Sequence, residues 1–220
     1  MRTHIDLSHT IKENLVTYKG LPPPLICDYL SREASKSFYA EGTSFQIGRI
    51  DMVSNTGTYI DCPFHRYEGG KDLSEVALEK FVDLPAVLIH APWQEGLAIG
   101  TEFFQNLDLY HKAVLIHTGW ATFWNTGKYY SDHPFVTEEA ALFLRSQGAG
   151  LVGIDSHNID DTRGNARPVH SILLREEILI VEHLCNLEQV PSVNFLFSAA
   201  PPKILNMGTF PVRAYATIKP

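Results

Sequence analysis

Four short apolar runs set the hydrophobic pattern of the chain, and each is bounded by polar or turn residues. The runs are AVLIHA (86–91), AVLIHT (113–118), AGLVGID (149–155) and ILIVEHL (178–184). Their length and their content of Val, Ile and Leu are typical of strands buried on both faces of a sheet. We therefore predict four core strands at these positions.

The segment VTEEAALFLRSQG (136–148), between the second and third runs, has the features of a helix. Thr137 can cap its first turn, and Gly148 can end it. Glu138 and Glu139 suit the positive end of the helix dipole. A helix that leads directly into a buried strand indicates an α/β layer.

Two flanking regions alternate more strongly between apolar and polar residues. These are residues 43–61 and 203–220, which we predict to form a second, partly antiparallel sheet. The three consecutive prolines of KGLPPPL (19–25) forbid a helix or a central strand, which indicates a surface connection. The predicted fold class is α/β, a mixed sheet with a helix layer.

Composition limits the classes of protein that the chain can represent. Its 220 residues, 45% of them hydrophobic, suit one domain over residues 1–220. The 18 basic and 25 acidic side chains give a formal charge of −7, and the basic residues form no runs, which argues against nucleic acid as a partner. No apolar stretch reaches membrane-spanning length, and the first residues do not resemble a signal peptide.

The cysteines indicate the redox compartment. Cys27, Cys62 and Cys185 are few, odd in number and outside any CxxC spacing. They therefore suggest neither a disulfide framework nor a thiolate zinc site. We expect a protein of the reducing cytoplasm.

Candidate chemistry begins with SNTGTYIDCPFHRYEGG (54–70). If residues 55–61 are extended, the period of two directs Asn55, Tyr59 and Asp61 to one side of the strand. Pro63 ends the strand, and His65 follows on a turn from which its imidazole can return toward Asp61. The alternative is a strand edge where Asp61 caps a turn and His65 is solvated.

Two later segments add ionisable groups. Pro168 begins a predicted short helix that carries His170 in its first turn. Glu182 lies inside the apolar run 178–184, where an unpaired charge is costly, so it needs a cation, a metal or hydrogen-bond donors unless it sits at an exposed strand end.

The third apolar run ends in GIDSHNIDD (153–161), a position where open α/β sheets often carry functional groups. Asp155, His157 and Asp160 can face a pocket there. Alternatively, their side chains satisfy the backbone of a turn.

The order of these residues carries a resemblance. NTGTYIDCPFH, LVGID, His170 and ILIVE are together similar to the cyclase family of metal-dependent hydrolases, which includes bacterial kynurenine formamidase and isatin hydrolase. The family signature is HxGTHxDxPxH. The resemblance implies a β/β/α fold of the swivelling-domain type and a homo-oligomer, dimer or tetramer. It also implies one or two divalent metals that activate water against an amide-like carbonyl.

The chain departs from this signature at two positions. Asn55 and Tyr59 stand where the family has histidines, whereas Asp61 and the final histidine, His65, match. The resemblance implies Asp61, His170 and Glu182 as metal ligands. Independently of the resemblance, His157 is an extra imidazole predicted near the same sheet edge, where it can compensate for a missing one. Asn is a weak neutral ligand and Tyr, with its pKa of about 10, is normally not ionised near neutral pH, so neither replaces histidine as a zinc ligand. Compared with a site that has all the signature histidines, this site is therefore relatively more favourable for Mn²⁺ or Mg²⁺. We expect Mn²⁺ or Zn²⁺, weakly bound.

The predicted function is metal-dependent hydrolysis of an amide, formamide, cyclic amide or lactone carbonyl of a small molecule, with His65 transferring protons. Aromatic residues within 118–130 can wall the pocket or pack in the core. A Cys62 nucleophile is disfavoured because nothing in the sequence supplies its base. The alternative from another class is a ligand-binding protein of the same fold that has lost its metal.

Overall fold

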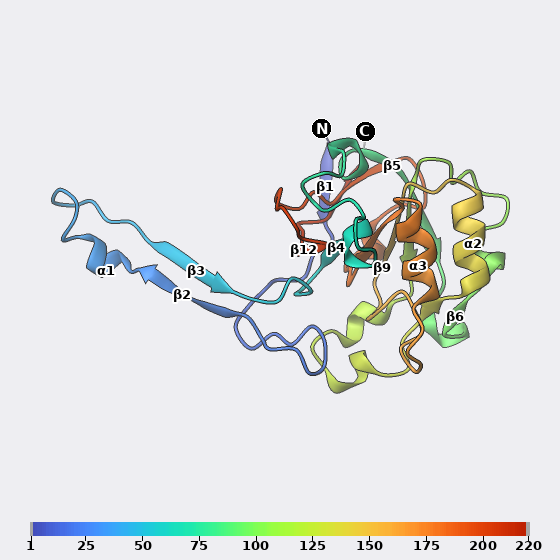
Figure 1. The fold of residues 1–220 in the computed structure, drawn as a ribbon, viewed down its shortest axis with the longest axis horizontal. Coiled ribbons are helices and arrows are strands. Elements are labelled where there is room, and N and C mark those ends of the chain that lie inside the picture. The colour runs from blue at the N-terminus through green and yellow to red at the C-terminus, as the bar shows by residue number, and fades with distance from the viewer. Residues whose placement is uncertain (1, 219–220) are drawn as a thin grey trace.

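The computed structural model describes residues 2–218, and its centre is a nine-stranded mixed sheet (Figure 1). The middle of this sheet is parallel and consists of β5 (Leu84–His90), β7 (Ala113–His117), β9 (Leu151–Ile154) and β10 (Leu179–Glu182). These strands correspond to the four apolar runs, and their central residues are buried. The prediction of four core strands is confirmed.

Antiparallel strands extend the sheet on both sides. Beyond β5 lie β11 (Phe195–Ser198), β13 (Tyr215–Ile218) and β1 (Thr3–Asp6). Beyond β10 lie β4 (Tyr59–Asp61) and β12 (Thr209–Pro211). The predicted mixed α/β class is therefore confirmed.

Two helices cover one face of the sheet. They are α2 (Glu138–Ser146) and α3 (Pro168–Arg175), which pack against Val114, Ile116 and their neighbours in one buried cluster. Thr137 caps α2 as predicted, because its hydroxyl accepts a hydrogen bond from the backbone N–H of Ala140 at 3.2 Å. Gly148 follows α2 with φ of +68°, the left-handed conformation expected after a helix end.

A second apolar cluster fills the other face. It contains Leu115 and Val181 from the central strands, Ile60 from β4 and Phe197 from β11. Residues of each central strand alternate between the two clusters, as Leu115 and Ile116 illustrate. The central strands are thus buried on both sides, which explains their unbroken apolar sequence.

The prediction of a second sheet from residues 43–61 and 203–220 is wrong. β4, β12 and β13 are strands of the same nine-stranded sheet, whereas β3 (Ile47–Asp51) pairs only with β2 (Leu25–Leu30). Alternation shows that a strand has two unlike faces, but it does not identify the neighbouring strand. The β2–β3 ribbon carries the four-residue helix α1 (Arg32–Ser35) and projects from the body (Figure 1).

The remaining elements are short. The strands β6 (Ala98–Ile99) and β8 (Phe135–Val136) form a separate parallel pair. Single 3₁₀ turns span Pro63–His65, Leu78–Lys80, Trp93–Glu95, Thr101–Phe103, Trp120–Phe123, Gly127–Tyr130 and Leu187–Gln189. No helix within residues 2–218 is both long and apolar enough to cross a membrane.

Candidate active site

Strand β4 brings the central residues of the sequence motif into the sheet. Tyr59 lies opposite Glu182 of β10, and Asp61 lies opposite Thr209 of β12. The expected extended segment 55–61 is a strand only from Tyr59 onward, because Gly57 turns the chain with φ of +69°. The two-residue repeat of a strand therefore applies only to Tyr59 and Asp61. Asn55 lies on a loop and lines the same cavity as Tyr59.

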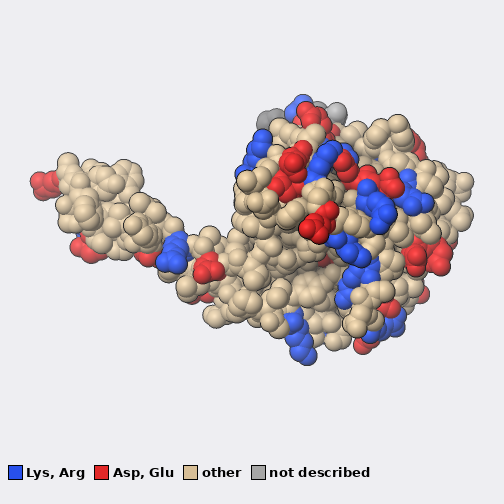
Figure 2. Space-filling view, viewed as in Figure 1, with Lys and Arg blue, Asp and Glu red and all other residues tan. Residues whose placement is uncertain are grey.

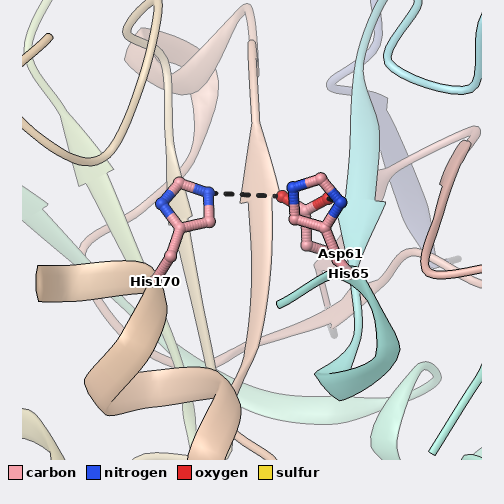
Figure 3. A group of neighbouring side chains, drawn as sticks. All are labelled: Asp61, His65 and His170. Carbon is pink, nitrogen blue, oxygen red and sulfur yellow. Dashed lines mark ion pairs between the residues drawn. The ribbon is translucent and has the colours of Figure 1, made fainter. Parts of the chain in front are cut away.

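Asp61 is fully buried and only partly hydrogen-bonded. Its Oδ1 accepts a hydrogen bond from the hydroxyl of Thr209. Its Oδ2 has no hydrogen-bond partner and lies 3.6 Å from Nε2 of His170 (Figure 3). Although burial alone would raise the pKa of Asp61, the neighbouring His65 and His170 hold it below its ordinary value. The carboxylate is charged and has an unused oxygen.

His170 lies in the first turn of α3, as predicted, and Asp160 fixes it there. The Asp160 carboxylate accepts hydrogen bonds from the backbone N–H groups of Val169 at 2.8 Å and His170 at 3.1 Å. It also contacts Nδ1 of His170 at 2.6 Å. A carboxylate only accepts, so Nδ1 carries the proton and Nε2 faces Asp61 and Glu182. Burial opposes the imidazolium, but these three carboxylates raise the pKa of His170 to about 10.

Glu182 is the fully buried carboxylate of strand β10. Its Oε2 accepts a hydrogen bond from the Tyr59 hydroxyl at 2.5 Å, and its Oε1 accepts one from the backbone N–H of Ile159 at 2.7 Å. Oε1 also lies 3.8 Å from Nε2 of His170. Burial raises the pKa of Glu182 to about 7, against the opposing charge of His170. Donors and a cationic neighbour thus surround this carboxylate, and it does not lie at an exposed strand end.

His65 approaches the same group from the 3₁₀ turn after β4 (Figure 3). This turn packs closely on Gly208. A Cβ at position 208 would lie 2.4 Å from the backbone nitrogen of His65, so position 208 requires glycine. Nδ1 of His65 lies 2.8 Å from the Thr209 hydroxyl oxygen. Because Thr209 gives its one proton to Asp61, Nδ1 is the donor in this contact and Nε2 remains free to accept a proton.

Asp61, His65 and His170 form a candidate metal site. One potential ligand atom from each lies within 4.8 Å of the others. Of the three, His65 is exposed and the other two are buried. The predicted set of Asp61, His170 and Glu182 shares two members with this group, and the structure brings all four side chains together. Their metal and proton-transfer roles stay predictions.

Three of these side chains, His65, His170 and Glu182, line an open cavity of about 630 Å³. Its walls combine aromatic, amide and basic side chains with the ionisable groups. They include Tyr18, Leu21, Asn55, Tyr59, His65, Arg66, Glu138, Asn158, Asn165, Arg167, His170, Ser171 and Glu182. On the face shown in Figure 2, the body is hollowed beside a group of Lys and Arg side chains. The size suits a small molecule.

His157 does not join the group. It is buried behind Tyr18, with the two ring centroids 4.4 Å apart, and burial lowers its pKa to about 3. Asp155 is also directed elsewhere, since its carboxylate accepts backbone hydrogen bonds from Thr118 and Gly119 at 2.8 Å each. Of the two alternatives for Asp155, the structure shows the second: its carboxylate accepts hydrogen bonds from the backbone of a turn and does not face the cavity.

Two further sequence hypotheses have clear outcomes. No residue of 118–130 lines the main cavity; Trp120 is buried and its indole N–H donates to the carbonyl of Tyr129 at 3.1 Å. The aromatic residues of this segment therefore pack within the protein and do not wall the cavity.

The hypothesis of a Cys62 nucleophile is also answered. Burial raises the pKa of the Cys62 thiol to about 12, which suits an inert core cysteine and not a nucleophile.

Sequence reasoning missed Tyr18 and Thr209 as residues of the site. Tyr18 comes from the N-terminal loop, and its hydroxyl accepts a hydrogen bond from the side-chain amide of Asn158. The same amide nitrogen lies 3.5 Å from Oε2 of Glu182. Thr209 bridges Asp61 and His65 from the far end of the chain. Tyr18 and Thr209 are far from the motif in sequence and carry ordinary loop and strand residue types, so no local signal marks them.

The donor set fits a divalent ion. Metal bonds of 2.0–2.1 Å in a tetrahedral arrangement place two ligand atoms about 3.3 Å apart. Nε2 of His170 lies slightly farther, 3.6 Å and 3.8 Å, from the carboxylate oxygens of Asp61 and Glu182. Oδ2 of Asp61 is buried without a hydrogen-bond partner, 3.6 Å from Nε2 of His170, and a bound cation would satisfy it. The chemistry of this group therefore matches a metal centre.

Comparison with known proteins supports the same conclusion. The family described as "Putative cyclase" matches residues 5–161. The chain belongs to this family. It is 31% identical over 215 residues to kynurenine formamidase of Geobacillus thermodenitrificans, covering 97% of each chain. It is 28% identical over 211 residues to kynurenine formamidase of Bacillus cytotoxicus, covering 96% of this chain and 95% of the relative.

Solved structures of other proteins share the fold. A "potential metal-dependent hydrolase with cyclase activity" superposes with a TM-score of 0.81 at 26% identity over the whole of both chains. Isatin hydrolase A from Ralstonia solanacearum gives a TM-score of 0.82 at 22% identity, covering 99% of this chain and 92% of that one. The predicted resemblance and fold are confirmed, and these similarities indicate an amidohydrolase-type enzyme.

Asp160 offers a test of how His170 is held. Replacing Asp160 with Asn keeps the shape but weakens the charged contact to Nδ1 that orients the imidazole. We expect metal affinity to fall by about 10- to 100-fold, the usual effect of losing such a supporting group. Competition with a chromogenic chelator measures this, with the partly exposed Asp161→Asn as the matched control. Unchanged affinity in Asp160→Asn would show that His170 needs no such support.

Proposed function

We propose that this enzyme hydrolyses a formamide, amide, cyclic amide or lactone carbonyl of a small molecule with the help of a divalent ion. One observation carries the proposal. His170 and the buried Glu182 line an open cavity, and the unpaired carboxylate oxygen of Asp61 lies 3.6 Å from the oriented Nε2 of His170. The similarity to proteins named kynurenine formamidase and isatin hydrolase supports the substrate class.

Asp61, His170 and Glu182 would hold the ion, with Mn²⁺ or Zn²⁺ as the expected metals. When bound, such an ion polarises a carbonyl and lowers the pKa of water. Asn55 and Tyr59 supply no imidazole, and the Tyr59 hydroxyl is engaged with Glu182, so binding should be weaker than in a relative with the full signature.

The protein's own groups provide the proton transfer. Thr209 links His65 to Asp61 and fixes Nδ1 as the donor, which leaves Nε2 to take a proton from the attacking water. The same nitrogen can return the proton to the departing nitrogen or oxygen. Because the His65 side chain is about one-third exposed, at 35%, its proton can exchange with solvent between turnovers.

The cavity walls would position the substrate. Asn55 and Asn158 offer amide groups, Tyr18 offers a ring, and Arg66 and Arg167 line the basic side. A cavity of about 630 Å³ has the size of a small-molecule site and would admit a one- or two-ring compound. The proposal places this reaction in the cytoplasm, in a single domain, which agrees with the three free cysteines.

Hydrolysis assays with and without metal test the proposal. We expect turnover of aryl formamide, cyclic amide or lactone substrates to rise with added Mn²⁺ or Zn²⁺ and to disappear after chelation. Re-addition of the ion should restore it. Metal-free protein that binds such compounds without hydrolysing them, even at millimolar metal, would instead indicate a ligand-binding protein.

Restoring the two missing imidazoles gives a further prediction. The double change Asn55→His and Tyr59→His adds nitrogen donors and releases Oε2 of Glu182 from the Tyr59 hydroxyl. Metal affinity should rise by about tenfold or more, since altered ligand surroundings commonly have effects of this size. Tyr59→Phe is the control, because it releases Glu182 without adding a ligand. Equal affinity in the double variant and in Tyr59→Phe would contradict the expectation.

A further inference from the structure

Arg66 is a cavity side chain that the proton transfer and the metal site do not use. It directly follows His65 at the end of the 3₁₀ turn after β4, and it is exposed and lines the open cavity. Its Nε donates a hydrogen bond to the hydroxyl oxygen of Ser171 in α3 at 3.0 Å. Arg66 therefore connects the turn that carries His65 with the helix that carries His170 at the edge of the cavity.

Ser171 and Tyr67 hold the guanidinium of Arg66 in place. The Ser171 hydroxyl donates its one proton to the carbonyl of Arg167 at 2.8 Å, so its oxygen is oriented to accept from Arg66. The Tyr67 hydroxyl donates to the carbonyl of Ser171 at 2.7 Å, and the Tyr67 ring centroid lies 5.4 Å from the guanidinium carbon of Arg66. An aromatic ring attracts a cation at this distance. The guanidinium thus has a defined position although it is exposed.

The outer nitrogens of Arg66 are unused. Within residues 2–218, its side chain donates through Nε alone, and neither Nη group has a hydrogen-bond partner. No carboxylate of the same range forms an ion pair with it. The Lys and Arg ion pairs there involve Lys36, Lys71, Lys80, Lys112, Arg163 and Arg213. Because a guanidinium presents its donors as a planar fork, both Nη groups are available to a ligand in the cavity.

Arg167, the second arginine of the cavity wall, has a different role. Its Nη1 donates to the backbone carbonyls of Gly164 at 2.8 Å and Ala166 at 2.7 Å, and it lies 3.3 Å from that of Asp161. These hydrogen bonds hold the loop before α3 and occupy one side of the guanidinium. Arg66 is therefore the cavity arginine whose two Nη groups both lack a partner in the described part of the chain.

We propose that Arg66 binds a carboxylate of the substrate and so determines which carbonyl compounds the enzyme accepts. The inference rests on the proposed function, because it places a charged group of the substrate beside His65. Arginine binds a carboxylate through two parallel hydrogen bonds, and one guanidinium balances its single charge. The substrate class is then an aryl formamide, cyclic amide or lactone that carries a carboxylate in addition to the carbonyl that is hydrolysed.

Calorimetry on the full chain tests the proposal by binding alone. The probes are 3- and 4-formamidobenzoate and the matching formamidobenzamides, which differ in the charge of one group. Each is titrated without and with Mn²⁺, because a carboxylate can also bind a divalent ion directly. In both conditions we expect at least one carboxylate isomer to bind the wild type about 10-fold or more tightly than its amide. Arg66→Gln should remove this preference, since hydrogen bonds to a charged group are lost.

Three further changes separate a carboxylate site from a general effect of charge. Ser171→Ala removes the acceptor that holds Nε and should weaken the preference, whereas Ser171→Thr keeps a hydroxyl and should preserve it. Arg66→Lys keeps the charge without the fork and should retain only part of it. The matched control is Arg175→Gln. Arg175 is exposed and lies 5.1 Å from the same Tyr67 ring, but it does not line the cavity, so the preference should persist.

Several outcomes would overturn the role of Arg66. They are equal binding of carboxylates and amides by the wild type, a preference that survives in Arg66→Gln, and an equal loss in Arg175→Gln. Inorganic phosphate that binds as tightly as the better formamidobenzoate would also overturn it, because the site would then take a free anion. Turnover of the same probes is measured separately. Hydrolysis without the carboxylate preference leaves the proposed function standing, whereas the preference without any hydrolysis supports the binding role of Arg66 and contradicts the proposed function.

Discussion

Asp61→Asn is expected to abolish metal binding and turnover together. The change keeps the volume and shape of the side chain but removes the negative charge and turns one oxygen into a nitrogen that cannot bind a cation. Since Oδ2 is the unpaired atom that faces His170, we expect metal affinity to fall by more than the roughly 10- to 100-fold typical of a supporting residue. Metal analysis after dialysis and a hydrolysis assay on the same samples measure both effects.

Asp155→Asn is the matched control for this experiment. Asp155 is an equally buried acid, but its carboxylate accepts hydrogen bonds from Thr118 and Gly119 and does not face the candidate site. That variant is expected to lose stability and keep metal. Should Asp61→Asn retain both its metal and its turnover, Asp61 is not a ligand.

His65→Ala is expected to lower kcat by about 10²- to 10⁴-fold, the range for a general acid or base, while most of the metal remains bound. The reason lies in its contacts. Thr209 holds Nδ1, so the free Nε2 suits proton transfer, while the buried Asp61 and His170 face each other without it. The pH profile of kcat should lose one limb in the variant, which a purely structural role would not cause.

The opposite outcome would change the assignment of His65. It lies within the group of three residues whose ligand atoms are 4.8 Å or less apart. If His65→Ala loses metal as completely as Asp61→Asn, His65 is a ligand and another group transfers the proton. The comparison of these two variants therefore separates its two roles.

Parts of this architecture could be predicted because their signals are local. The apolar runs identified the four central strands, and Thr137 and Gly148 identified the ends of α2. Because burying an unpaired charge is costly, the sequence predicted hydrogen-bond donors or a cation around Glu182. Tyr59 and Ile159 are the donors, and His170 is the cationic neighbour. In each case the residues that decide the structure lie close together in sequence.

Other parts depend on pairing between distant segments. Alternation in β3 and β4 did not reveal that the first pairs with β2 in the projecting ribbon while the second joins β10 and β12. The same limitation hid the contributions of Tyr18 and Thr209 to the site. His157 was a plausible extra ligand by sequence, but the chain buries its ring beside Tyr18, away from the carboxylates.

Equilibrium dialysis of the wild-type protein against Mn²⁺ and Zn²⁺ tests the central claim most directly. Because Asp61, His170 and Glu182 present converging donors and Asp61 Oδ2 lacks a partner, we predict saturable binding of a divalent ion. The binding should disappear in Asp61→Asn and persist in Asp155→Asn. A wild-type protein that stays free of metal at millimolar Mn²⁺ and Zn²⁺ would contradict the account.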